Sequence, residues 1–134
     1  MAKASLGREL EVSTANKVGM LAEVSGLIAD AGVNITAISA YATGKDAIFR
    51  IVTNDNAKAK NILTPKGFKV KENEVVTVNL PDQVGQAKEI ADKIKQAGIN
   101  LDYIYGSTCG CADTAAIMVI GSKNNTQIVS AING

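Results

Sequence analysis

Two sets of polar residues and glycines recur along this chain with one constant spacing. In each set an Asn or Asp precedes a glycine by three residues, and an Asn follows that glycine by fifteen. A carboxamide can donate and accept hydrogen bonds at once, which suits a zwitterion, and a carboxylate can hold an ammonium group. These are binding chemistries. The sets are Asn16, Gly19 and Asn34, and, 66 residues later, Asp82, Gly85 and Asn100.

The same residues also have structural explanations. The Asn or Asp before each predicted helix can act as an N-cap, and the Asn after it can occupy a turn. Gly32 and Gly98 have the position of glycines that end a helix. Gly19 and Gly85 are harder to explain, since glycine in a helical turn costs about 0.5 to 1 kcal/mol relative to alanine. Their recurrence indicates a close approach, either by a ligand or by the other half of the chain.

The elements that position these residues follow one order twice. Apolar residues alternate over 8–14, 33–39 and 47–53, which predicts strands, and helical spacing follows Asn16 and again spans 55–64. A strand near 68–72 runs almost directly into 75–80, with the boundary at Asn73 and Glu74. The second half continues with a helix over 84–97, strands over 99–106 and 114–121, and a helix over 124–132.

This order predicts an α+β fold of two tandem ferredoxin-like βαββαβ units, residues 1–74 and 75–134, each with helices on one face of an antiparallel sheet. The second unit lacks its last strand, so we expect a partner chain or domain at the unpaired sheet edge. The loop between its middle strands is two residues longer than in the first unit and contains Cys109 and Cys111.

The repeated segments resemble the signature of ACT domains, in which an Asp or Asn, then two residues, then a glycine stand at the start of the first helix, and a Gly-x-Asn-hydrophobic junction enters the second strand. The resemblance implies that the units pair side by side and bind a small effector, often an amino acid, at their interface. The second copy is the more polar, with Asp82 and Gln86 in place of Asn16 and Met20. The candidate ligand contacts are Asn16, Gly19, Met20, Leu21, Asn34, Ile35, Asp82, Val84, Gly85, Gln86, Ala87, Asn100 and Leu101.

Composition argues against several other functions. The 134 residues carry a formal net charge of +1 with interspersed charges and no histidine, so no nucleic-acid-binding patch is expected. No apolar stretch is long enough to span a membrane, and two cysteines one residue apart form no disulfide framework, so we expect a cytoplasmic protein. Zinc needs four ligands, and no catalytic constellation stands out. We expect no metal, no cofactor and no catalytic residue.

The sequence therefore predicts a regulatory protein that binds a small molecule, carries out no reaction itself, and works as a homodimer or with a metabolic enzyme. Two alternatives stay open. The chain could be an assembly subunit that binds no ligand, or a thiol or metal protein built around Cys109 and Cys111.

Overall fold

The computed structural model describes residues 2–108 and 116–134. The chain divides into two compact units. We call residues 8–73 the first unit, and residues 2–7 together with 74–134 the second unit. The division between Asn73 and Glu74 lies one residue before the predicted end of the first unit at residue 74. Assignment of residues 2–7 to the first unit, as the boundary 1–74 implied, is wrong, because these residues pack with the second.

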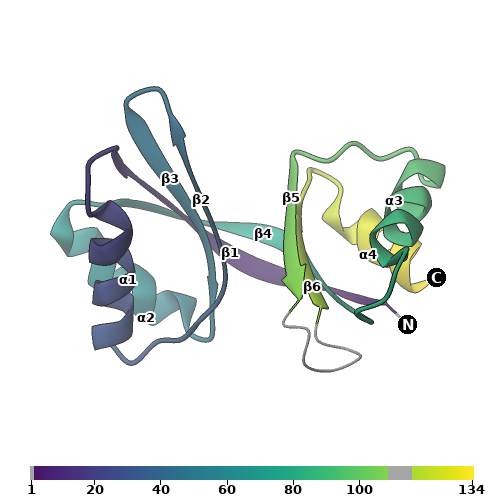
Figure 1. Cartoon of the computed structure of the whole chain (residues 1–134), viewed down its shortest axis with the longest axis horizontal. Coiled ribbons are helices and arrows are strands. Elements are labelled where there is room, and N and C mark those ends of the chain that lie inside the picture. Colours follow the sequence, from purple (N-terminus) through teal and green to yellow (C-terminus); the bar gives the residue numbers. More distant parts are fainter. Residues whose placement is uncertain (1, 109–115) are drawn as a thin grey trace. The chain divides into compact units, whose positions relative to one another are not determined.

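The first unit is a four-stranded sheet covered on one face by two helices (Figure 1). Its strand order is β2-β3-β1-β4, and β3 pairs antiparallel with both β1 and β2. The order confirms the ferredoxin-like prediction. The elements are β1 (Lys3–Ala15), α1 (Met20–Asp30), β2 (Ile35–Thr43), β3 (Asp46–Thr53), α2 (Asn56–Leu63), a 3-10 turn (Thr64–Lys66) and β4 (Lys69–Leu80). The unit takes β1 from Arg8 onward and β4 as far as Asn73.

The second unit repeats this layout. β4 continues into it, followed by α3 (Gln86–Gln96), β5 (Tyr103–Thr108), β6 (Ala116–Gly121) and α4 (Asn125–Asn133). β6 pairs antiparallel with β4 and with β5, and both helices cover one face (Figure 1). The register makes Met118 the counterpart of Phe49, since they pair with Gly106 and Ala40 respectively. Gly106 follows Ala40 by 66 residues, whereas Met118 follows Phe49 by 69. The second copy is therefore three residues longer between its middle strands, and the predicted difference of two is wrong.

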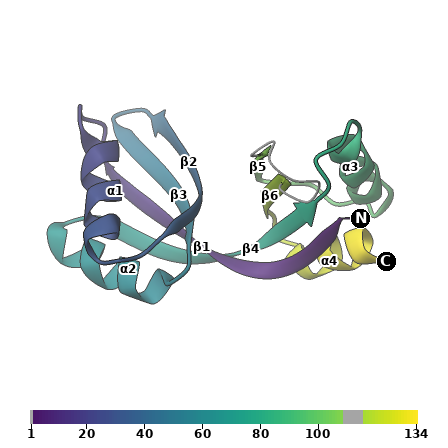
Figure 2. The ribbon, with the colours of Figure 1, turned by 60° about the horizontal axis from the view of Figure 1, so that its bottom comes forward.

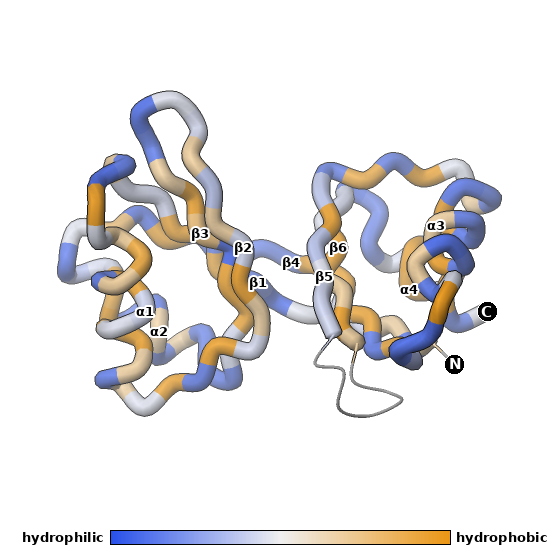
Figure 3. The backbone as a smooth tube through the Cα atoms, in the orientation of Figure 1, coloured by the Kyte–Doolittle hydropathy of each residue, from blue (hydrophilic) through white to orange (hydrophobic). Residues whose placement is uncertain are grey.

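Each unit has its own apolar core. Val24 and Ile28 of α1 are fully buried, and Ile90 and Ile94 of α3 are almost fully buried. Their helical spacing predicts this. Leu21, three residues before Val24, lies in the first turn of α1, and 56% of it is exposed. Hydrophobic residues occur along the strands and along α1, whereas α3 has many hydrophilic residues (Figure 3).

The N-terminal residues of the chain supply the strand that the second unit lacks. Ser5 Oγ lies 3.2 Å from Thr77 Oγ1 on β4. The Ala4 N–H donates to Asn133 Oδ1, and Asn133 Nδ2 donates to the Ala4 carbonyl, both at 2.8 Å. Only 3% of Ala4 is exposed, and it belongs to the same core as Val78. Figure 2 shows this end of β1 beside α4.

The expectation of an unpaired edge at this position is therefore wrong. The second unit has no strand after α4, as predicted, but residues 3–7 take its place. The long strands β1 and β4 thus each begin in one unit and end in the other. Arg8 and Glu74 are the first residues of β1 and β4 after the division between the units, and equivalent asparagines bind both. Asn56 Nδ2 donates to the Arg8 carbonyl, and Asn125 Nδ2 donates to the Glu74 carbonyl, each at 3.0 Å.

Candidate functional site

The two repeated glycines start the first helix of each unit in a left-handed backbone conformation. Gly19 has φ 89° and Gly85 has φ 90°, a region that other residues rarely adopt. A Cβ at either position would meet nothing within 4 Å. The backbone conformation, rather than a close approach by another part of the protein, therefore explains why both copies keep glycine here.

The helices begin later than the sequence suggests. Gly19 and Gly85 are themselves the N-caps of α1 and α3, so the expectation that Asn16 and Asp82 cap these helices is wrong. The residues between each Asn or Asp and the helix form a turn. In this turn the Met20 N–H donates to the Lys17 carbonyl, and the Gln86 N–H donates to the Gln83 carbonyl. Among residues 2–108 and 116–134, no side chain caps either helix. Their first N–H groups and partial positive charge are thus available to an anion.

Beside each of these helix starts lies a shallow hollow. The second-unit hollow, of about 240 Å³, is bounded by the turn before α3 and by the facing ends of β5 and β6. Its polar lining comes from Asp82, Gln83, Gln86, Ser107 and Thr108. Ala87 and Met118 are among its apolar residues. A carboxylate, carboxamides, hydroxyls and an uncapped helix start therefore converge at one place.

The first-unit hollow, of about 280 Å³, lies at the equivalent place beside α1. It brings together four predicted contacts, Asn16, Gly19, Met20 and Leu21, with Tyr41 of β2. The Tyr41 hydroxyl accepts a hydrogen bond from Arg50 Nε at 3.0 Å. This hollow has Lys17 in its wall and no carboxylate in the lining.

The Gly-x-Asn junctions lie at the opposite end of each helix. Gly32 and Gly98 end α1 and α3 in the left-handed conformation, as predicted. In the first unit their neighbours, Asn34 and Ile35, lie outside the hollow. In the second unit Asn100 and Leu101 line a different cavity. The predicted contacts of one copy therefore do not gather in a single pocket.

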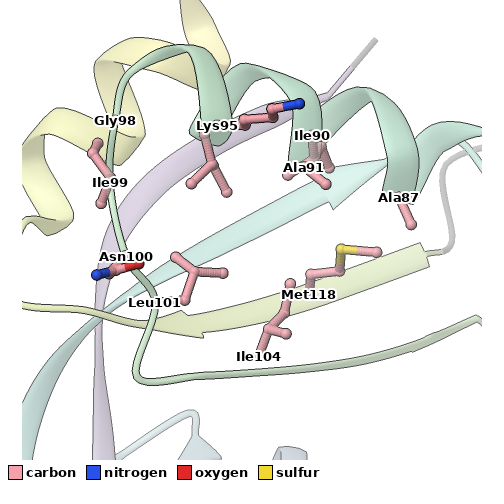
Figure 4. Close-up of a pocket in the computed structure, with 11 residues that line it drawn as sticks. Ala87, Ile90, Ala91, Lys95, Gly98, Ile99, Asn100, Leu101, Ile104 and Met118 are labelled. Carbon is pink, nitrogen blue, oxygen red and sulfur yellow. The ribbon is translucent and has the colours of Figure 1, made fainter.

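That different cavity is a groove of about 530 Å³ between α3 and strands β5 and β6 (Figure 4). Its walls are mainly apolar, and Lys95 and Asn100 are its polar members. The lining residues are Ala87, Ile90, Ala91, Ile94, Lys95, Gly98, Ile99, Asn100, Leu101, Ile104 and Met118. Ala87 and Met118 also line the second-unit hollow, so the groove and the hollow adjoin.

Sequence reasoning missed some of these residues and misplaced one. Val84 was expected to contact the ligand, but it is fully exposed and lines neither the hollow nor the groove. Ser107, Thr108 and Met118 were missed. The topology could have indicated them, because a ferredoxin-like fold brings the end of its second strand next to the start of its first helix.

Charged groups elsewhere are paired or dispersed. A hydrogen bond from Lys88 to Asp92 at 2.6 Å, together with the charge of that carboxylate, raises the pKa of Lys88. This pair faces solvent and contributes little stability. Over residues 2–108 and 116–134, no three His, Cys, Asp or Glu side chains cluster as metal ligands would. Cys109 and Cys111 lie outside the described residues. No described helix has both the length and the apolarity to cross a membrane.

Comparisons with known proteins agree with this architecture. A family model described as "ACT domain pair" matches residues 7–132. A comparison with curated protein sequences finds no match. Among solved structures, protein BT0572 from Bacteroides thetaiotaomicron has a similar fold, with a TM-score of 0.86 and 23% identity over 97% of this chain and 88% of that one.

Two further structures with a similar fold have stated roles. The regulatory subunit of aspartate kinase from Thermus thermophilus, solved in its ligand-free form, gives a TM-score of 0.63 at 15% identity, over 97% of this chain and 94% of that chain. The corresponding subunit from Thermus flavus gives 0.65 at 15% identity, over 98% and 94%. At these identities the likeness concerns the fold.

Proposed function

The chain belongs to the ACT domain pair family, and on that premise we propose that it is a non-catalytic regulatory protein whose second unit binds an amino acid. The observation that carries this proposal is the second-unit hollow, where Asp82 lies beside the uncapped start of α3. These two features have opposite charge preferences. They match the two charges of a free amino acid.

In this arrangement the effector's carboxylate accepts hydrogen bonds from first-turn N–H groups of α3, where the helix dipole also favours negative charge. Its ammonium group faces the Asp82 carboxylate. Gln86 and Ser107 offer further polar contacts at the wall of the hollow. Each charge of the ligand thus meets a group of opposite sign, without a metal or a cofactor.

The second unit fits a zwitterion better than the first. Asn16 replaces the Asp82 carboxylate, and Lys17 places a cation in the wall of the first-unit hollow. A cation there repels an ammonium group. We therefore assign the effector to the second unit.

Regulatory subunits of aspartate kinase with a similar fold support a regulatory role. We propose that this chain regulates a metabolic enzyme, or a second copy of itself. The effector would bind with different affinity to two alternative arrangements of the chain and its partner. Without such a difference, binding would shift no equilibrium.

Thermal unfolding of the full chain with each of the twenty amino acids tests this function. A ligand at 100 times its dissociation constant adds about 2.7 kcal/mol of stability, so the unfolding midpoint should rise by several degrees. Asp82→Asn, which introduces the first copy's residue, should weaken binding about tenfold or more, because a charged hydrogen-bond partner is lost. Asp30→Asn, at an exposed position of α1, is the matched control. An unchanged midpoint with all twenty would contradict the proposal.

A second candidate function is assembly without a ligand. Val18 and Val84, at equivalent positions in the two copies, are fully exposed. A protein-protein contact at either position would remove this side chain from water. In that case the partner enzyme should bind equally well with and without amino acids, and Val84→Ser should weaken that binding while leaving any amino-acid affinity unchanged.

A further inference from the structure

We propose that the effector is an amino acid with a large apolar side chain, and that this side chain occupies the groove along α3. The inference rests on the proposed function, since it assumes that the charged groups of the effector bind in the second-unit hollow. It adds the chemical class of the ligand.

The hollow and the groove form a continuous path. Ala87 and Met118 line both. Figure 4 shows these two residues facing each other at the end of the groove nearest the start of α3, with Asn100 and Leu101 at the other end. A ligand whose charged groups lie against the first turn of α3 would thus extend its side chain between Ala87 and Met118.

The groove has the chemistry of an apolar side-chain pocket. Ile90 and Ile94 form buried parts of its wall, whereas 48% of Ile104 is exposed. Its volume of about 530 Å³ falls within the range of small-molecule sites, about 300 to 1,000 Å³. An apolar side chain would remove Ile104 and its neighbours from water. The described lining offers no carboxylate to the cationic side chains of lysine and arginine.

The first unit has different residues along the equivalent path. At the positions of Ala87 and Met118 it has Leu21 and Phe49, and both of these larger residues line the first-unit hollow. The two copies therefore differ in the pair of residues that flank the path. Because of this difference, we assign the large side chain of the ligand to the second copy.

Isothermal titration calorimetry on the full chain tests the inference. Leucine, methionine and phenylalanine should bind at least tenfold more tightly than glycine, alanine and serine, since each methylene removed from water adds about fourfold in affinity. Lysine should bind no better than alanine.

Ala87→Leu, which introduces the first copy's residue, should weaken leucine binding at least tenfold more than it weakens alanine binding, because it narrows the entrance to the groove. Ala57→Leu, at an exposed position of α2 in the first unit, is the matched control and should change neither. If Ala87→Leu fails to fold, as judged by circular dichroism, Met118→Phe makes the same comparison. Tight binding of small amino acids, or equal loss for leucine and alanine, would overturn the inference and leave the proposed function standing. No binding by any amino acid would overturn both.

Discussion

At the residue scale, the repeated glycines have a backbone role that the sequence indicates only in part. Their recurrence at one spacing could be read directly, but their φ angles near 90° depend on a turn that has no distinctive sequence pattern. Asn16 and Asp82 looked like N-caps because such residues usually precede helices. The turn between them and the glycines instead places Asp82 in the wall of a hollow. The candidate site was thus predictable in composition, but not in geometry.

Substitutions at glycine test this explanation. Gly85→Ala should lower the free energy of unfolding by about 1 to 2 kcal/mol, because alanine is strained in the left-handed region. Gly26 lies inside α1 without a positive φ, and a Cβ there meets nothing within 4 Å. Gly26→Ala should therefore raise stability by about 0.5 to 1 kcal/mol. Chemical denaturation of both variants measures the difference. Equal effects would contradict a backbone role for Gly85.

A buried ion pair in the first unit gives a second test at this scale. Arg50 lies 3.2 Å from Glu9, whose side chain is fully buried, and 3.3 Å from Glu11. Arg50→Met should destabilise the chain by about 3 kcal/mol or more, since it leaves carboxylates buried without this cation. Lys58→Met, at an exposed position of α2, serves as the control in urea denaturation. A loss below about 1 kcal/mol would show that Arg50 contributes little.

At the scale of elements, helices and central strands were predictable because they bury regular apolar patterns. The missing strand was not. Residues 3–7 read KASLG, in which apolar Ala4 and Leu6 alternate with polar residues over too short a stretch to indicate a strand, and only Ala4 among them is buried. Their pairing is stabilised by contacts distant in sequence, chiefly Ala4 with Asn133 and Ser5 with Thr77. Local patterns carry no information on such contacts.

Loss of these contacts should affect the second unit selectively. Asn133→Ala removes both hydrogen bonds to the Ala4 backbone and should cost about 1 to 3 kcal/mol. Hydrogen exchange should become faster in residues 3–7, β4 and α4, while β3 of the first unit keeps its protection. Asn124→Ala is a suitable control, since no side-chain hydrogen bond of Asn124 caps α4. Uniform loss of protection throughout the chain would contradict completion of the second unit by its N-terminal segment.

At the scale of the whole molecule, the two copies share one fold but differ in the hollows beside α1 and α3. The sequence predicted both the duplication and the greater polarity of the second copy. It could not show that Ala87 and Met118 join a polar hollow to an apolar groove, because these residues lie on different elements and meet only through the strand register. The inequality between copies is what assigns the proposed effector to the second unit.

Titration of the isotope-labelled full chain with leucine, followed by amide chemical shifts in NMR spectra, tests the central claim most directly. The account predicts saturable shifts at Gln86, Ala87 and Lys88 and at Ile104 in the groove, with little change at Met20 and Leu21 of the first unit. Asp82→Asn should reduce these shifts at equal leucine concentration. Shifts confined to the first unit, or none with leucine or any other amino acid, would contradict the account.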